Sequence, residues 1–424
     1  MESLVAAILI SLCLIIFVYS QIVKDFWNPL VLFVYPLVCQ YLLYMCLYSS
    51  EIRISDKTNI LVLFGIISFI LGYLSIALKL SNNIQDKINN EIFYNKNIEF
   101  ILFIVAMIFI FFAFCDLLNN KIYGIYGDNY IRNIRHNMLY DKVEGQFFYK
   151  YGPFILYALC LLEFEKVLES GRYLKRLFFL IFILYSTNIF YMARTAILQY
   201  TLSFAYLTFI YINNKSNKYI KMKSLLYSIL CIFIVFFLFD KIALYLVKIG
   251  SVSYLSKDYY VYKYIAYPLV TFDRYVINNP LSTSGYFILG PIGKILKHIG
   301  IYPDDILKRG FDIPPTIFNV TSYLQAPYND FGTIGIIVVT FLLGLISGFI
   351  YKQARKKGHY WRLFYANYIY SIVISFFAYQ FSMTSHVYLL CLFLLLRINS
   401  KGRGKRHSSC SWSSLFPTQP SHLR

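Results

Sequence analysis

Long apolar runs recur along almost the whole chain, and they constrain its fold more than any other feature. The chain is 58% hydrophobic and only 14% charged, and runs of 17 or more apolar residues follow one another from the first residues onward. About 20 apolar residues cross a bilayer, and backbone polar groups cannot be left unpaired in lipid. The sequence therefore predicts an all-α polytopic membrane protein.

We predict about eleven transmembrane helices (11–12), which divide the chain into four parts. The spans lie near 3–20, 30–48, 59–79, 98–117, 147–164, 177–193, 195–212, 224–240, 332–351, 363–381 and 384–397. They form an N-terminal bundle of about eight spans (1–240), a large outer loop with surface helices (241–331), C-terminal helices (332–397) and a tail (398–424). The tail differs sharply in composition, so we expect it to be disordered and cytoplasmic, or a non-native end.

The distribution of Lys and Arg predicts the orientation. The links 165–176, 213–223 and 352–362 and the tail are basic, and all four fall on one side of an eleven-span topology. Basic links remain in the cytoplasm, which explains the formal charge of +19 without nucleic acid. The large loop and the N-terminus should then face outward.

The link 119–146 departs from this rule, because it is predicted to be external yet holds four cations. These are Lys121, Arg132, Arg135 and Lys142. Retained external cations indicate either an anionic ligand or a solvated loop. Arg135 is therefore a candidate for substrate binding.

No metal or cofactor site is predicted. Seven of the eight cysteines lie inside apolar runs, so neither a disulfide framework nor a cysteine metal site is indicated. His136, His298 and His386, predicted to be external, are not at metal-ligand spacing. Each of them could still act as a base near neutral pH.

Two arginines on the predicted outer side are candidates for binding a diphosphate. Arg194 lies between two short spans with almost no connecting loop, and Arg274 lies in the large loop. A charge at the membrane face is costly, so it pairs, lines a functional cavity or extends its head group to water. The guanidinium is always charged and presents a planar fork of donors that matches phosphate oxygens.

Asp330 is the candidate for an acid–base group, because it lies where the large loop re-enters the membrane. It precedes the span that begins near Gly332. Asp is also a favoured N-cap residue, so a purely structural role as the cap of that span is an alternative. No Glu follows Glu169, which leaves Asp, His or Tyr as acids or bases in the loop.

Two further patterns predict packing and membrane contact. Tyrosines at 254, 259, 260, 262, 264 and 267 suit a helix on the membrane surface, or stacking against sugar rings. The spacing of Gly344 and Gly348 permits close contact between two helices.

Four segments together resemble the O-antigen polymerases of the Wzy type, which join oligosaccharide repeat units. They are FWNPLVLF (26–33), MARTAIL (192–198), SGYFILGPI (284–292) and NVTSYLQAPYNDFGTIG (319–335). Arg274 and Gly285 are separated by ten residues, which resembles the R-x10-G pattern of such polymerases; a second copy is not found. Related ligases carry a late His motif, whereas this chain has Asn329-Asp330 there, which favours a polymerase.

The resemblance implies a GT-C-like glycosyltransferase of the bacterial inner membrane that acts without a cofactor at the periplasmic face. Donor and acceptor would both be oligosaccharides linked to undecaprenyl pyrophosphate, with a chain-length regulator and a flippase as partners. We predict Arg194, Arg274 and Asp330 as catalytic. The substrate-binding candidates are Arg194, Arg274, Arg135, Gly285, Tyr286, Asn319, Tyr323, Tyr328 and Asn329. An O-antigen ligase, or a flippase or other transporter of lipid-linked oligosaccharides, is the alternative.

Overall fold

The computed structural model describes a helical protein over most of its length. It describes residues 1–23, 25–47, 49, 52–77, 96–119, 146–170, 174–190, 194–216, 260–277, 284–303, 321–356, 359–383 and 385–393, and these residues form no strand. Six described helices are long and apolar enough to cross a membrane. They are α1 (Glu2–Val23), α2 (Pro29–Leu47), α3 (Asp56–Ala77), α4 (Lys96–Asn119), α8 (Arg194–Ser216) and α14 (Gln325–Lys356). The prediction of a helical membrane protein is confirmed.

The remaining predicted spans have different outcomes. Helix α6 (Gln146–Ser170) covers the span predicted at 147–164, and α7 (Leu174–Phe190) covers the predicted span 177–193 up to residue 190. Residues 385–393 are also helical. The span predicted at 224–240 lies outside the described residues. The span predicted at 363–381 is wrong in its second half. Helix α15 (His359–Val373) continues into the short 3-10 helix η1 (Ile374–Phe376), which ends at Phe376. Residues 378–383 are not helical.

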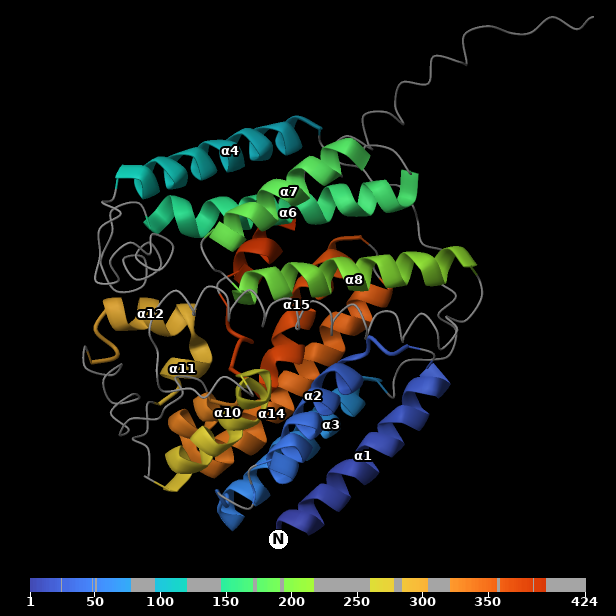
Figure 1. The fold of residues 1–424 in the computed structure, drawn as a ribbon, viewed down its shortest axis with the longest axis vertical. Coiled ribbons are helices and arrows are strands. Elements are labelled where there is room, and N and C mark those ends of the chain that lie inside the picture. Colours follow the sequence, from blue (N-terminus) through green and yellow to red (C-terminus); the bar gives the residue numbers. More distant parts are fainter. Residues whose placement is uncertain are drawn as a thin grey trace, which may run out of the picture.

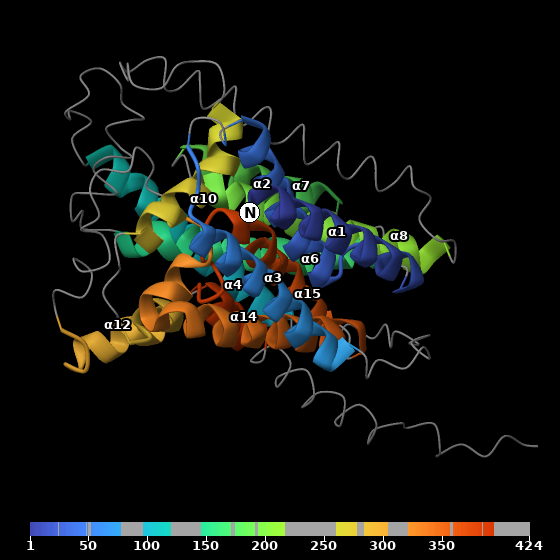
Figure 2. The same ribbon diagram turned by 90° about the horizontal axis from the view of Figure 1, so that it is seen from below.

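The helices form two groups with α15 between them (Figures 1 and 2). One group holds α1, α2, α3 and α14, the other holds α4, α6, α7 and α8, and α15 contacts α2, α8 and α14. Every residue from Arg362 to Ile372 is buried. A helix that is apolar or aromatic on all sides suits such a central position.

Contacts along the bundle define its two ends. Gly65 of α3 approaches Ile336 of α14, and Gly72 approaches Phe341, so these two helices run in the same direction. Gln199 bonds Asn367 while Ser203 bonds Ala366, so α8 and α15 run in opposite directions. We call the end where α3, α8 and α14 begin the outer end, following the predicted topology, and the other the inner end.

Glycines bring α3 and α14 into backbone contact, as the spacing of Gly344 and Gly348 predicted. A Cβ atom on Gly344 would lie 2.2 Å from the carbonyl oxygen of Phe69, and one on Gly72 would lie 2.0 Å from that of Phe341. Small residues let helix backbones approach closely where lipid offers no hydrophobic driving force between helices. The prediction of close packing is confirmed.

Replacing Gly344 by Ala should force the two helices apart and destabilise the protein by about 1–3 kcal/mol. Gly348→Ala is the matched control, because its Cβ would meet its nearest neighbour, the ring of Tyr73, at 3.3 Å. Both variants gain the same helix propensity, so their difference isolates the collision. Thermal melting in nanodiscs measures it, and equal melting temperatures would contradict this packing.

Candidate functional site

Segments from distant parts of the chain meet at the outer end. Helix α10 (Tyr260–Ile277) packs against α2, α3 and η1, and the Ser322 N–H donates to the carbonyl of Pro268 at 3.4 Å. The Tyr323 N–H donates to the carbonyl of Ser375 at 2.9 Å. Most residues of α10 from Ala266 onward are buried. Of the tyrosine-rich stretch at 254–267, the structure describes the side chain of Tyr267, which is half-buried, so the surface helix predicted for this stretch stays a prediction.

Asp330 holds the SGYFILG segment against the start of α14. Its side chain is fully buried, Oδ2 accepts the N–H of Ile288 at 2.8 Å and Oδ1 accepts that of Phe287 at 3.3 Å. These are unpaired donors in the first turn of the short helix α11 (Tyr286–Leu289), so Asp330 caps α11 from a distant part of the chain. The helical conformation of α14 is interrupted at Phe331 and Gly332, so the span does begin near Gly332, directly after Asp330. The hydrogen bonds described for the Asp330 side chain go to α11, and a cap on the span itself stays a prediction.

Glycines make this arrangement sterically feasible. Gly285, which precedes α11, has a φ of 95°, and Gly290, which follows it, has a φ of 52°. A Cβ on Gly290 would lie within 2.5–2.8 Å of three atoms of Ser382. Helix α14 also bends just after Asp330, where Gly332 has a φ of 62°. Only glycine adopts these left-handed conformations readily, so the sequence fixes the path of the chain around α11.

Arg274 is exposed in the last turn of α10, and two cations missed by the sequence analysis lie on the segment that bonds to its neighbour Asp273. The N–H and hydroxyl of Ser55 both donate to Asp273 Oδ1, at 2.8 and 2.6 Å. The exposed Arg53 and Lys57 each lie two residues from Ser55. This contact therefore gathers Arg53, Lys57 and Arg274, which we call the outer cation group.

The outer cation group is not neutralised by ion pairs within the described part of the chain. Asp56, in the first turn of α3, pairs with none of the three, and Asp273 is buried with Ser55 as its partner. Lys57 Nζ lies 5.4 Å from the ring centroid of Tyr328. Cations in a link predicted to be external were the sequence feature that could have identified Arg53 and Lys57. Such a group is suited to an anionic ligand.

The other predicted site residues have different positions. Arg194 is the first residue of α8, which begins on the side of the molecule where α11 and α12 (Pro291–His298) lie (Figure 1). The Arg194 side chain lies outside the described side chains, so its place beside Arg274 stays a prediction. Arg135 and Asn319 lie outside the described residues. Tyr286, Tyr323, Tyr328 and Asn329 are buried, with 1–5% of their surfaces exposed.

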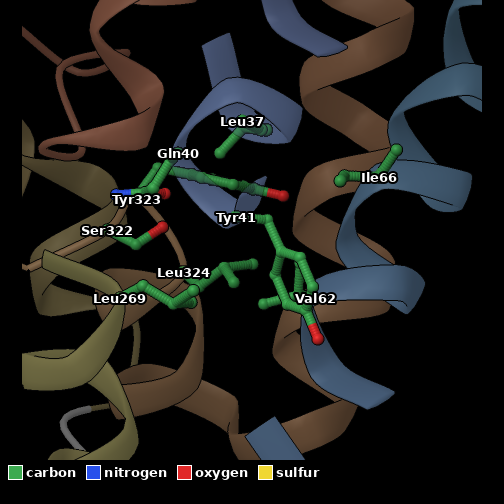
Figure 3. A pocket seen from close by; sticks show the side chains of 9 residues that line it. All are labelled: Leu37, Gln40, Tyr41, Val62, Ile66, Leu269, Ser322, Tyr323 and Leu324. Carbon is green, nitrogen blue, oxygen red and sulfur yellow. The ribbon is translucent and has the colours of Figure 1, made fainter. Parts of the chain in front are cut away.

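Tyr323 belongs to the core and lines a small cavity between α2, α3 and α10 (Figure 3). Its ring packs edge-on against Phe33, with centroids 5.1 Å apart. The cavity measures about 10 Å³, which is room for about one water molecule. It is lined by Leu37, Gln40, Tyr41, Val62, Ile66, Leu269, Ser322, Tyr323 and Leu324. A sugar does not fit in this cavity, so Tyr323 does not bind one there.

The inner end differs electrostatically, because several of its described charges form ion pairs. Glu165 Oε1 lies 2.8 Å from His359 Nδ1 and 3.1 Å from Arg362 Nε. Arg176 lies 2.9 Å from Glu99. The contacts of Glu165 bring the links 165–176 and 352–362 to one end of the bundle, which agrees with the prediction that both lie on one side of the membrane.

His386 is buried within a continuous hydrogen-bonded network rather than being external as predicted. Asn367 Oδ1 accepts from Gln199 at 2.6 Å, and its amide nitrogen donates to His386 Nδ1 at 2.7 Å. His386 Nε2 lies 2.6 Å from Ser371 Oγ, which donates to the carbonyl of Gln380. A neutral imidazole satisfies every group if Nδ1 accepts from Asn367 and the Nε2–H donates to the Ser371 hydroxyl oxygen. The network ties α8 and α15 to the turn after η1.

Asn367→Ala should therefore destabilise the protein, because it leaves buried groups of Gln199 and His386 without a partner. Each unpaired group costs about 1–3 kcal/mol. Asn188→Ala is the matched control, since that buried amide donates, among the described residues, to Leu184 in its own helix. Thermal melting of the two variants measures the difference. A smaller loss for Asn367→Ala than for Asn188→Ala would refute the network.

Neither a metal site in the described part of the chain nor a similar known protein points to a function. Among the described residues, no three His, Cys, Asp or Glu side chains form a group able to hold a metal ion. No protein-family model, no curated protein and no solved structure matches the chain.

Proposed function

We propose that the protein is a membrane glycosyltransferase that polymerises lipid-diphosphate-linked oligosaccharide repeat units, as an O-antigen polymerase does. One observation carries the proposal. The two late segments that resemble these polymerases, SGYFILGPI and NVTSYLQAPYNDFGTIG, are joined through Asp330. They lie at the end of the bundle that carries the outer cation group, since Lys57 contacts Tyr328 of the second segment.

The chemistry of this reaction suits an exposed group of fixed cations. A lipid diphosphate is a good leaving group, so the protein must mainly stabilise the negative charge that develops on it. One preorganised donor aimed at such a charge contributes about 3–4 kcal/mol once the bound substrate excludes water from it. Positioning two membrane-bound substrates contributes further by removing translational freedom before the reaction.

The candidate residues take two roles in the proposal. Arg274 binds the diphosphate together with Arg53 and Lys57, and Arg194 contributes from the start of α8. Asp330 acts as a positioning residue, since both of its oxygens accept backbone N–H groups of α11. We assign the proton transfer from the acceptor hydroxyl to no single residue.

The proposed topology has eleven spans in a GT-C-like arrangement, in a bacterial inner membrane with the outer end facing the periplasm. Six apolar helices and the paired basic links at the inner end support it. The lipid-linked donor and acceptor would both approach through the outer leaflet. A chain-length regulator and a flippase would act with the protein in the cell.

Polymerisation by the purified protein tests this function. Nanodiscs hold no gradient, so a transporter alone cannot act in them. We expect synthetic lipid-linked repeats to yield a ladder of longer chains, with one lipid diphosphate released per bond. Transfer only when lipid A core is supplied would identify a ligase instead, and translocation in vesicles without bond formation would identify a transporter.

A further inference from the structure

Helix α12 presents a stripe of exposed isoleucines. Ile292, Ile295 and Ile299 are 54%, 60% and 65% exposed. Their spacing of three and four residues places them on one face of the helix. Lys294, Lys297 and His298 lie on the opposite face by the same spacing. The helix is therefore strongly amphipathic, with its apolar side uncovered by the described part of the chain.

The local structure fixes this stripe in place. Pro291 occupies the first helical position, and Gly300, with a φ of 82°, ends the helix. The Ile301 N–H donates to the carbonyl of Leu296 at 2.9 Å, and the Gly300 N–H donates to that of Lys297 at 3.0 Å. These two bonds are the Schellman motif, which satisfies the last carbonyls of a helix.

Helix α12 is also held against the rest of the protein. A Cβ on Gly293 would lie 2.6 Å from the carbonyl oxygen of Tyr286, so the two backbones are in contact. The Tyr302 hydroxyl donates to the carbonyl of Ser284 at 2.9 Å. Helix α11 in turn is capped by Asp330. The direction of the isoleucine stripe is thus set by a chain of contacts that leads to α14.

The apolar surface of the span in α14 continues onto α12. Phe331 and Ile334, where the span begins, are 52% and 71% exposed, and Leu289 of α11 is 36% exposed. A Cβ atom on Gly285 would lie 3.5 Å from the ring of Phe331 and 3.9 Å from Leu289, so Gly285 lies close to both side chains. Helix α12 extends beyond the end of α14 in Figure 2.

We propose that α12 lies in the interface of the membrane leaflet at which α14 begins, with its isoleucines toward the acyl chains and Lys294 and Lys297 at the phosphates. Short amphipathic helices with basic residues on the polar face bind membranes in this way. Continuity with a candidate span favours lipid over a partner protein. The inference is independent of glycosyl transfer, because it concerns only membrane contact.

Quenching by lipid measures the depth of α12. A dansyl amino acid is incorporated at position 295, or at position 294 as the matched control, in full-length protein in nanodiscs that hold one copy. The lipids carry a nitroxide on the acyl chain. We expect quenching at position 295 to exceed that at position 294 by about two-fold or more, with bluer emission.

Three results would overturn the proposal. Equal quenching at the two positions would mean that the stripe does not face lipid. Red-shifted, unquenched emission at position 295 would place it in water, and blue-shifted, unquenched emission would place it under protein. Unchanged thermal melting shows that each labelled protein is folded, and light scattering confirms one copy per nanodisc, so lipid is the only quencher.

Discussion

Arg274→Ala is expected to lower the rate of polymer formation by about 10²–10³-fold, the cost of removing one preorganised donor from a developing negative charge. The side chain is exposed at the outer end, and Asp273, not Arg274, makes the contact with Ser55 that holds α10 to α3. Stability should therefore change little. Arg274→Lys should retain part of the activity, because it keeps the charge but loses the planar fork.

A matched control for Arg274→Ala is available at the other end of the bundle. Lys175, near the start of α7, is also an exposed cation, and Lys175→Ala should leave polymer formation unchanged. Rates are measured with purified protein and synthetic lipid-linked repeats, together with thermal melting. Wild-type rates and chain lengths in Arg274→Ala would remove this residue from diphosphate binding.

Asp330→Ala should detach α11 from α14 and abolish most of the activity. Two backbone donors lose their buried acceptor, and an unsatisfied buried donor costs about 1–3 kcal/mol. Hydrogen exchange at Phe287 and Ile288 should become faster, and the effect should extend into α12, which contacts Tyr286. Wild-type protection of these amides in Asp330→Ala would contradict the capping role.

Asp330→Asn separates a positioning role from a role as general base. The amide keeps one acceptor oxygen but turns an NH₂ group toward the second donor, so α11 should be partly released. If Asp330 positions α11, activity should fall in proportion to the loss of protection. Complete loss of activity with α11 fully protected would instead identify the carboxylate as the base.

The parts of the fold that follow from local sequence were predictable. Six of the predicted spans are apolar helices, because the cost of unpaired backbone in lipid leaves no other regular structure. Contact at Gly344 followed from spacing, since small residues four apart share one face of a helix. The shared side of the basic links followed from charge.

The parts that depend on distant contacts were not predictable. Residues 374–381 are as apolar as a span, yet the chain turns there. The carbonyl of Phe376 accepts a hydrogen bond from Gln40, 336 residues earlier in the chain. The carbonyl of Ser375 accepts one from the N–H of Tyr323, more than 50 residues earlier. Asp330 looked like a local cap because Asp favours that role, but it caps a helix 42 residues earlier.

Site residues were the hardest to predict, because residue type does not reveal exposure. Tyr323 was a candidate for substrate binding, yet it lies in the core against Phe33. The segment that carries Arg53 and Lys57 is joined to the end of α10, which carries Arg274, by the contact between Ser55 and Asp273. Such a contact, 218 residues apart in the chain, has no counterpart in local sequence.

Photo-crosslinking of a lipid-diphosphate sugar tests the central claim most directly. The probe carries a diazirine next to the diphosphate, and the adducts are mapped by mass spectrometry on full-length protein in nanodiscs. We expect saturable adducts on the peptides that contain Arg53, Lys57 and Arg274, with competition by unlabelled substrate. Adducts confined to the inner end around Arg355 and Arg362, or no saturable adduct at all, would contradict a diphosphate site at the outer end.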